Sequence, residues 1–267
     1  MEKRREKRTV RGIITSNKKI AENLFLMTIK EKWLVTKSKA GQFVNVKVAE
    51  NSTDPLLRIP LGIHQIKKEG ISLLYKVVGR GTKILSSKQA KGSIDVLGPL
   101  GTPFDISNTD KNTMVIVISG GHGLAPLFAL SEELRRKKHH VEFFMGARTG
   151  EHLVRDKELK KIGVIVHKVT DDGSCGFKGC VTDAVEKVLA AQGKKYAKKQ
   201  IFACGPLPMI KAVAAIAARE KIPAQVTRDE YMACGIGACR GCAVRTKEGI
   251  KLACTDGPVF DAAILEW

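Results

Sequence analysis

The first third of the chain carries short hydrophobic runs interrupted by polar residues. Between residues 22 and 29 successive side chains fall on two opposite faces, which is typical of a β-strand. Polar or glycine-rich turns separate this run from similar ones. These predict further strands at residues 9–14, 41–48, 59–66, 72–78 and 93–97. Together the strands predict a six-stranded antiparallel barrel over residues 9 to about 104.

The pattern changes at Thr113, where residues 114–119 form a continuous apolar run. A glycine turn at residues 120–123 and a helical stretch at 125–137 follow this run. Strand, glycine turn and helix are the opening of a parallel α/β unit. Further strands are predicted at 141–146, 164–169 and 200–203, and helices at 156–160, 182–191 and 208–220. The sequence therefore predicts a Rossmann-like domain at residues 105–222.

The remaining residues, 223–267, contain a cluster of cysteines and are predicted to form a small third domain. The cysteines are Cys234, Cys239, Cys242 and Cys254, with the spacing C-x4-C-x2-C-x11-C. The first three match the plant-type pattern in which a tight loop wraps a [2Fe-2S] cluster and a later cysteine completes it. We therefore expect these four residues to be metal ligands. The predicted domains are residues 1–104, 105–222 and 223–267.

The residues between the cysteines are small, which suits this prediction. Gly235, Gly237 and Gly241 leave the main chain free to turn its N–H groups toward the sulfides of a cluster. Zinc remains an alternative because four thiolates also suit that ion, although zinc ribbons usually present two C-x2-C pairs. Cys239 and Cys242 alone could form a C-x-x-C redox pair.

The composition indicates a folded protein of a reducing compartment. Hydrophobic residues make up 43% of the 267 residues, and no stretch is long enough to cross a bilayer. The basic N-terminal residues are not followed by the apolar segment of a secretory signal, so we expect a cytoplasmic protein. Seven cysteines, four of them clustered, favour a cofactor over a disulfide framework.

The chain is strongly basic, with 46 Lys and Arg against 27 Asp and Glu and a net charge of +19. The basic runs lie at residues 3–11, 135–138 and 194–199. They lack interleaved aromatic residues, and no nucleic-acid motif accompanies them. The pattern favours a solvated basic surface, and we expect neither nucleic acid nor membrane as a partner.

Two turns of the α/β domain are candidate nucleotide-binding elements. The first begins where a strand meets a helix, so its glycines let the backbone approach a pyrophosphate at the helix N-terminus. The second follows another strand at the carboxyl edge of the sheet, where ligands bind in such folds. Their candidate residues are Gly120, Gly121, Gly123, Ala125 and Pro126, and Cys204, Gly205, Pro206 and Met209. The first turn is not the G-x-G-x-x-G fingerprint, so a purely structural turn remains an alternative.

The order of barrel, Gly-Gly-x-Gly-x-Ala-Pro and Cys-Gly-Pro resembles the ferredoxin–NADP reductase superfamily. With the cysteine segment and the tail at residues 256–260, the chain resembles the electron-transfer subunits of NAD-dependent (B-type) dihydroorotate dehydrogenases. The resemblance runs from about residue 9 to the end. It implies FAD on the barrel, NAD(H) on the α/β domain and a [2Fe-2S] cluster. It also implies a separate FMN-containing catalytic subunit, with which the chain forms a heterotetramer.

The resemblance also implies the FAD-binding positions. They are Arg58, Pro60, Leu61 and Gly62 in a first motif, and Leu74, Tyr75, Lys76, Gly81 and Thr82 in a second. Gly62 stands where the family has a Ser or Thr near flavin N5, which bears on flavin reactivity more than on flavin binding. Ile59 separates Arg58 from Pro60, where an arginine directly precedes the proline in the commonest form. A surface salt bridge for Arg58 and a barrel-core position for Tyr75 are the alternatives.

The implied activity is an electron relay in which NADH reduces FAD and the electrons leave singly through the cluster. Hydride transfer between nicotinamide and flavin needs stacking and exclusion of water but no protein base. We therefore predict no catalytic side chain and give none of that role to His122 in the glycine turn. Cys175 and Cys180 are interpreted as bystanders.

Two other functions remain open. The Arg-x-Pro-Leu motif at residues 58–61 resembles the flavoprotein subunits of NADH-dependent ferredoxin–NADP or sulfide dehydrogenase complexes. Their first cluster ligand is an aspartate, however, where this chain has Cys234. The high positive charge and Gly62 leave a third hypothesis, a non-enzymatic zinc or nucleic-acid-binding module on a reductase scaffold.

Overall fold

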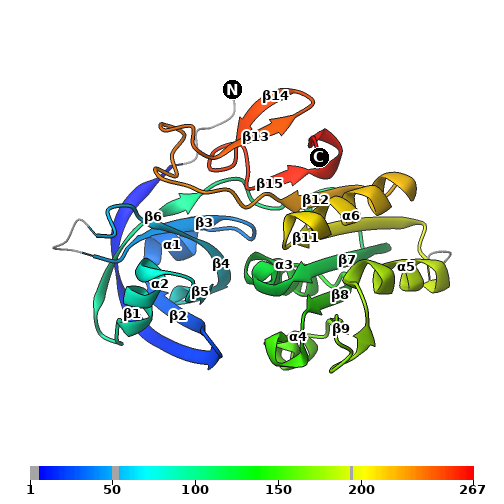
Figure 1. Cartoon of the computed structure of the whole chain (residues 1–267), viewed down its shortest axis with the longest axis horizontal. Helices are drawn as coiled ribbons and strands as arrows, with labels where there is room; N and C mark the ends of the chain where they lie inside the picture. Colours follow the sequence, from blue (N-terminus) through cyan, green and yellow to red (C-terminus); the bar gives the residue numbers. More distant parts are fainter. Residues whose placement is uncertain (1–5, 50–53, 193–194) are drawn as a thin grey trace.

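The computed structural model describes residues 6–49, 54–192 and 195–267. Its N-terminal part is a closed antiparallel barrel with the strand order β1-β2-β5-β4-β3-β6, which confirms the predicted six strands (Figure 1). The strands are β1 Arg8–Ala21, β2 Leu24–Lys30, β3 Phe43–Lys47, β4 Ile59–Lys67, β5 Gly70–Lys76 and β6 Ser93–Leu100. Two short helices, α1 Lys32–Lys37 and α2 Arg80–Ser87, connect strands of the barrel.

Strand β1 is much longer than the predicted strand at residues 9–14. Its first half pairs with β6 and its second half with β2, and shifts of register occur after Ile14 and Lys19. One strand therefore joins both edges of the barrel sheet. The second half carries exposed and half-buried polar residues such as Asn17 and Lys18, so a hydrophobic pattern could not reveal it.

The second part is a parallel sheet covered by helices, as the change of pattern at Thr113 predicts. The complete sheet has the order β10-β9-β8-β7-β11-β12-β15. Its strands are β7 Thr113–Gly120, β8 His140–Ala147, β9 Ile165–Thr170, β10 Phe177–Lys178, β11 Lys198–Cys204, β12 Ala224–Thr227 and β15 Val259–Asp261. The strands from β7 to β12 pair in parallel with their neighbours, and β15 is antiparallel to β12.

Helices cover both faces of this sheet. They are α3 Leu124–Arg136, α4 Asp156–Lys161, α5 Val181–Gln192 and α6 Leu207–Arg219, with the 3-10 turns η1 Gly121–Gly123 and η2 Gly150–His152. Helices α5 and α6 contact each other, while α3 packs on β7, β8 and β11. Within the described ranges no helix is both long enough and apolar enough to span a membrane.

The C-terminal segment lies across both of the other parts (Figure 1). It contains the hairpin of β13 Ala243–Thr246 and β14 Gly249–Leu252, then β15 and the 3-10 turn η3 Ala262–Ile264. Strand β15 adds to the edge of the parallel sheet beside β12, where Phe260 pairs with Val226. The sheet thus continues past residue 222, and the cysteine segment is fixed to it at both ends.

The barrel and the parallel sheet meet where β4 packs on α3. His64 of β4 is fully buried, and its Nδ1 lies 3.0 Å from the carbonyl oxygen of Ala125 at the start of α3. Gln65 donates to Glu132 at 2.7 Å and accepts from Arg155 at 3.0 Å. These contacts fix the barrel strand relative to the glycine turn that precedes α3.

Candidate functional site

A cavity of about 1340 Å³ lies between the barrel and the carboxyl ends of the parallel strands. Strands β2 and β5 of the barrel form one wall, and the turns after β7 and β11 form the other. The predicted residues that line it are Leu74, Lys76, Gly120, Gly121, Gly123, Gly205, Pro206 and Met209. The structure therefore brings Leu74 and Lys76 of the second predicted flavin motif to the same crevice as both predicted nucleotide turns.

The two turns pack directly on each other, which explains their glycines. A Cβ on Gly123 would lie 1.8 Å from the carbonyl oxygen of Cys204, so no other residue fits there. A Cβ on Gly120 would lie 2.7 Å from the sulfur of Met209. Gly121 has φ +54 and no atom within 4 Å of its Cβ position, so its backbone is open to a ligand. The arrangement suits a pyrophosphate at the N-terminus of α3.

Three predicted positions of these turns support the crevice from behind. Ala125 and Pro126 lie inside α3 and are buried, and Cys204 is buried at the end of β11. Burial, aided by the nearby carboxylate of Asp229, raises the pKa of the Cys204 thiol well above its usual value. A thiol with a raised pKa is a poor nucleophile, so Cys204 has a structural position behind the crevice.

Tyr75 lies in the barrel core and does not line the crevice. Its hydroxyl donates to Asn17 at 2.9 Å, and its ring stacks on Phe25 with centroids 5.7 Å apart. Burial raises the pKa of Tyr75 to about 12. Because side chains alternate along a strand, Leu74 and Lys76 face the crevice and Tyr75 faces inward. Only the backbone of Tyr75 is left for a flavin.

The remaining flavin positions lie outside the crevice, along β4 and α2. Arg58 forms an ion pair with Asp95 at 2.7 Å, which is the salt bridge considered as its alternative role. The Thr82 hydroxyl accepts from the N–H groups of Val78 and Gly79 at 3.0 and 3.2 Å, so it caps helix α2. The capped N-terminus of α2 is ordered, and a helix N-terminus is a favourable place for a phosphate.

Gly62 and its neighbours on β4 adjoin the glycine turn. A Cβ on Gly62 would meet Pro126 at 3.7 Å, an ordinary contact, and no closer atom. The position therefore has room for a side chain that the sequence does not supply. Pro60 and Leu61 precede it on the same strand and pair with Asn45 and Val44 of β3.

Several residues of the crevice carried no motif in the sequence. They lie at or just after the carboxyl ends of β8, β9 and β12, and are Arg148, Glu151, His152, Asp171, Thr227, Arg228, Asp229 and Glu230. Arg228 pairs with Glu230 at 2.5 Å, and burial raises the pKa of Asp229. From the sequence, these residues could be found only by their place directly after predicted strands, because ligands of such sheets bind beyond the carboxyl ends of the strands. His122 and Cys180, left without a role, also line the crevice.

The cysteine loop is shaped by residues with positive φ. Gly235, Gly237 and Arg240 have φ of +70, +88 and +57. The turns aim the N–H groups of Ile236 and Cys239 at the sulfur of Cys234, each at 3.4 Å. Burial opposes ionisation of this thiol, but the N–H groups outweigh it and lower the pKa of Cys234 to about 6. The loop thus favours a thiolate before any metal binds.

The four thiols form two pairs. The backbone N–H of Cys239 donates to the sulfur of Cys234. Burial, together with the neighbouring Cys242 thiol, raises the pKa of Cys254 to about 12. The second pair is buried in a hydrophobic cluster, whereas Cys239 is exposed. Over residues 6–49, 54–192 and 195–267, no three His, Cys, Asp or Glu side chains converge as ligands of one metal ion. Two pairs of thiols suit the two irons of a [2Fe-2S] cluster, each held by two thiolates.

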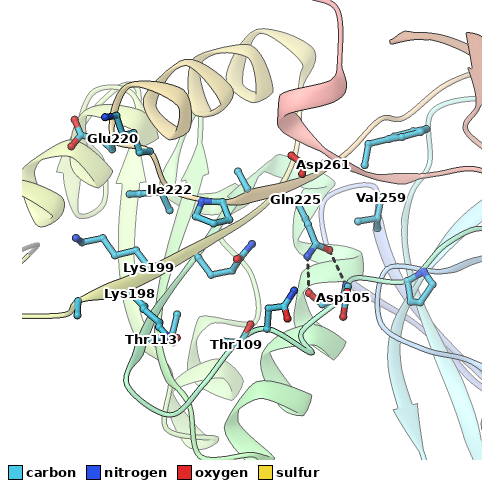
Figure 2. Close-up of a pocket in the computed structure, with 18 residues that line it drawn as sticks. Asp105, Thr109, Thr113, Lys198, Lys199, Glu220, Ile222, Gln225, Val259 and Asp261 are labelled. Atoms are coloured by element: carbon cyan, nitrogen blue, oxygen red, sulfur yellow. Dashed lines mark hydrogen bonds between the residues drawn. The ribbon is translucent and has the colours of Figure 1, made fainter. Parts of the chain in front are cut away.

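A second cavity, of about 710 Å³, lies at the opposite, amino-terminal edge of the sheet (Figure 2). Gln225 closes one wall by accepting from the N–H of Asp105 at 2.8 Å and donating to its carbonyl at 2.6 Å. Lys198 in this cavity is paired with Asp110 at 2.7 Å. None of the predicted site residues lines this second cavity.

Solved structures share this arrangement of barrel and sheet. A ferredoxin–NADP+ reductase from Neisseria gonorrhoeae with bound FAD and NADP covers 79% of this chain and 91% of its own, with TM-score 0.66 and 16% identity. The NADH-dependent reduced ferredoxin–NADP oxidoreductase structure, from work on flavin-based electron bifurcation, covers 96% and 90%, with TM-score 0.84 and 32% identity. The fold is that of the ferredoxin–NADP reductases.

Family models and curated relatives narrow this class. Residues 229–266 match the iron–sulfur cluster binding domain of dihydroorotate dehydrogenase B, and residues 117–215 match the oxidoreductase NAD-binding domain. The dihydroorotate dehydrogenase B (NAD(+)) electron transfer subunit of Bacillus pumilus is 35% identical over 93% of this chain and 95% of its own. That of Fusobacterium nucleatum is 31% identical over 95% and 96%. The chain belongs to the family of dihydroorotate dehydrogenase B electron transfer subunits, which confirms the resemblance.

Proposed function

We propose that this chain passes electrons between NAD(H) and an FMN-containing dihydroorotate dehydrogenase catalytic subunit, through FAD and a [2Fe-2S] cluster of its own. The assembly oxidises dihydroorotate to orotate with reduction of NAD+, a step of pyrimidine biosynthesis. The observation that carries the proposal is that the chain contains both the crevice between barrel and sheet and, directly after it in sequence, the loop with the four cysteines. When bound, FAD exchanges a hydride with the nicotinamide, and the cluster exchanges single electrons.

The residues of the chain bind and orient these groups. The open backbone at Gly121 and the N-terminus of α3 hold the nucleotide pyrophosphate, and Gly205 and Pro206 bound the nicotinamide end of the crevice. FAD is held by residues 58–62 at the start of β4, by the β5 positions 74–76 and by the N-terminus of α2 at Gly81 and Thr82. Leu74 and the buried wall behind it exclude water, and no side chain has to move a proton.

The four cysteines hold the cluster with its second pair buried and its first pair toward the surface. Because Cys239 is exposed, the electron leaves or enters on that side. Large apolar side chains are exposed in the same segment: Tyr231 is 97% exposed, Ile236 46% and Trp267 44%. We place the catalytic subunit on this surface, because tyrosine and tryptophan are enriched among the residues that contribute most of the binding energy of protein interfaces. We further propose a heterotetramer in the cytoplasm, with the functional units at residues 1–104, 105–222 and 223–267.

An anaerobic titration with NADH tests the proposal. The chain is purified after co-expression with its catalytic subunit, and flavin and iron–sulfur absorbance are followed together with EPR. We expect bleaching of flavin accompanied by the signal of a reduced [2Fe-2S] cluster, and orotate formation from dihydroorotate with NAD+. Protein that carries zinc, or that binds no flavin in the complex, would refute the relay.

A second function has a specific observation in its favour. The motif Arg58-x-Pro60-Leu61 and the TM-score of 0.84 both point toward NADH-dependent ferredoxin–NADP oxidoreductase complexes. Cys234 as first ligand favours the dihydroorotate assembly. Turnover with dihydroorotate in the purified complex distinguishes the two functions, because only the first predicts it.

A further inference from the structure

Asn45 lies on the outer face of β3, yet its side chain is completely buried. Its neighbours Val44 and Val46 point into the barrel core, so the alternation of the strand directs Asn45 outward. The cysteine loop covers this outer face. A barrel side chain that would otherwise meet solvent is therefore held beneath the cluster segment.

The amide of Asn45 contacts the loop at the first cysteine. Its Nδ2 donates to the carbonyl oxygen of Cys234 at 3.3 Å. The next residue, Gly235, has φ +70, and a Cβ there would lie 2.2 Å from Nδ2 and 3.1 Å from Cγ of Asn45. The amide thus occupies the space that any side chain at position 235 would need. The two positions are matched in shape as well as joined by a hydrogen bond.

The other end of the amide has no partner. Oδ1 of Asn45 is buried without a hydrogen bond in the described structure. An unpaired buried acceptor is destabilising, so an apolar residue of similar volume would suit stability better. The feature that distinguishes asparagine from such a residue here is the donor aimed at Cys234.

The position of Asn45 also relates it to the flavin strand. Asn45 pairs with Pro60 of β4, within the motif to which we assign FAD. One residue therefore lies directly between the strand that carries the flavin motif and the peptide of the first cluster ligand. Among the described contacts, it is a direct polar link from the barrel strands to the cysteine loop.

We propose that Asn45 is a positioning residue that holds the first cluster ligand against the barrel and raises the midpoint potential of the cluster. This rests on the proposed function. The Nδ2–H dipole points at the peptide of Cys234, where it stabilises the additional negative charge of the reduced state. The same contact fixes the loop at a constant distance from the flavin strand.

Two variants test the role of the amide. Asn45→Leu keeps the volume and removes the donor, and Asn45→Asp keeps the shape but places an acceptor against the Cys234 carbonyl. Both are made in the complete chain with its catalytic subunit. We expect an EPR-monitored midpoint potential more negative than in the wild type, altered g-values and roughly fivefold faster loss of iron to a chelator. NADH-dependent bleaching of flavin stays unchanged.

Gln42→Leu is the matched control. Gln42 is a buried amide that directly precedes β3. It donates to the carbonyl oxygen of Gly101 at 2.9 Å and accepts from the N–H of Lys39 at 2.9 Å, so both ends of its amide bond to residues outside the cysteine loop. It should lower the unfolding temperature but leave the potential and the g-values unchanged. A shift equal to that of Asn45→Leu would overturn the proposal, because general loosening would then explain both.

Combination with Gly235→Ala tests the direct contact. The alanine methyl clashes with the amide, so Asn45→Ala should recover part of the iron occupancy that Gly235→Ala alone loses. Strictly additive losses would contradict the contact. Wild-type protein without a [2Fe-2S] signal would refute the relay itself, whereas a normal wild type with unchanged Asn45 variants would refute this inference alone.

Discussion

Gly62 shows how one absent side chain bears on reactivity. Its family counterpart carries a hydroxyl near flavin N5, and the space for that group is present here because Pro126 lies 3.7 Å from a Cβ. Gly62→Ser should therefore fit without strain and supply the missing hydrogen bond. We expect flavin reduction by NADH to accelerate about tenfold, with unchanged FAD content. Stopped-flow absorbance measures this rate.

Gly62→Ala is the control for that experiment, since it fills the same space without a hydroxyl. It should leave the rate near the wild-type value. Equal acceleration in both variants would mean that packing, and not hydrogen bonding, controls the flavin at this position.

Cys239 is the exposed member of the first thiol pair. Cys239→Ser should remove or cripple the cluster, because a serine hydroxyl is a poor substitute for a thiolate. NADH-dependent flavin reduction should persist, since the crevice shares no residue with the loop at residues 234–242. Iron analysis measures the loss of the cluster, and stopped-flow absorbance measures the rate of flavin reduction. Cys175→Ser, which lies outside the loop, is the control and should change neither the iron content nor flavin reduction. If Cys239→Ser lost both the cluster and flavin reduction with the fold intact, the two sites would not be separate.

At the residue scale, the sequence predicted chemistry better than orientation. The spacing of the cysteines identified a loop whose backbone turns toward Cys234. Tyr75 matched a family motif, but only the pleat of β5 decides that it points into the core and leaves Leu74 and Lys76 at the crevice. Arg58 and Thr82 likewise satisfy local partners that a motif does not reveal.

At the scale of elements, the packing of β4 on α3 buries an ionisable group. Burial lowers the pKa of His64 to about 3, and the positive charges of Arg155 and Lys67 add to this effect. In the unfolded chain the imidazole of His64 is protonated below about pH 6.5. In the folded chain it is protonated only below about pH 3. The contribution of His64 to stability is therefore fully present above pH 6.5 and falls by up to about 4 kcal/mol as the pH approaches 3.

Urea unfolding between pH 7 and pH 4 measures this dependence. In His64→Phe the ring still packs on Phe128, whose centroid lies 4.6 Å from that of His64, but no proton is taken up. In the variant, the slope of the free energy of unfolding against pH should be smaller in this range by the amount that corresponds to about one proton. An unchanged slope would show that other groups dominate the acid sensitivity.

The elements themselves were largely predictable where one face is buried. The apolar run of β7 and the helix after it follow from periodicity. The polar half of β1 and the addition of β15 beside β12 were not predictable, because both depend on partners distant in sequence. Local hydrophobic patterns contain no information about such pairing.

For the whole molecule, the proposed partner surface gives a separate test. Tyr231 is almost fully exposed and follows the crevice segment directly. Tyr231→Ser should weaken dihydroorotate-dependent NAD+ reduction roughly tenfold at limiting subunit concentration, because an aromatic anchor is lost. Ferricyanide reduction by NADH, which needs no partner, should not change.

Ile165→Ser is the control, since Ile165 is 45% exposed at the other edge of the molecule, at the start of β9. It should leave both activities unchanged. Binding of the Tyr231→Ser variant to the catalytic subunit as tightly as wild type would place the interface elsewhere.

Residues 227–230 line the nucleotide crevice and lead directly into the loop of Cys234. A bound nucleotide and an added electron therefore act on one short stretch of backbone. Linkage requires any such influence to be reciprocal: the factor by which reduction changes nucleotide affinity equals the factor by which nucleotide shifts the reduction equilibrium. Binding of the nucleotide and reduction of the cluster then share a single coupling free energy, which is carried by residues 227–234.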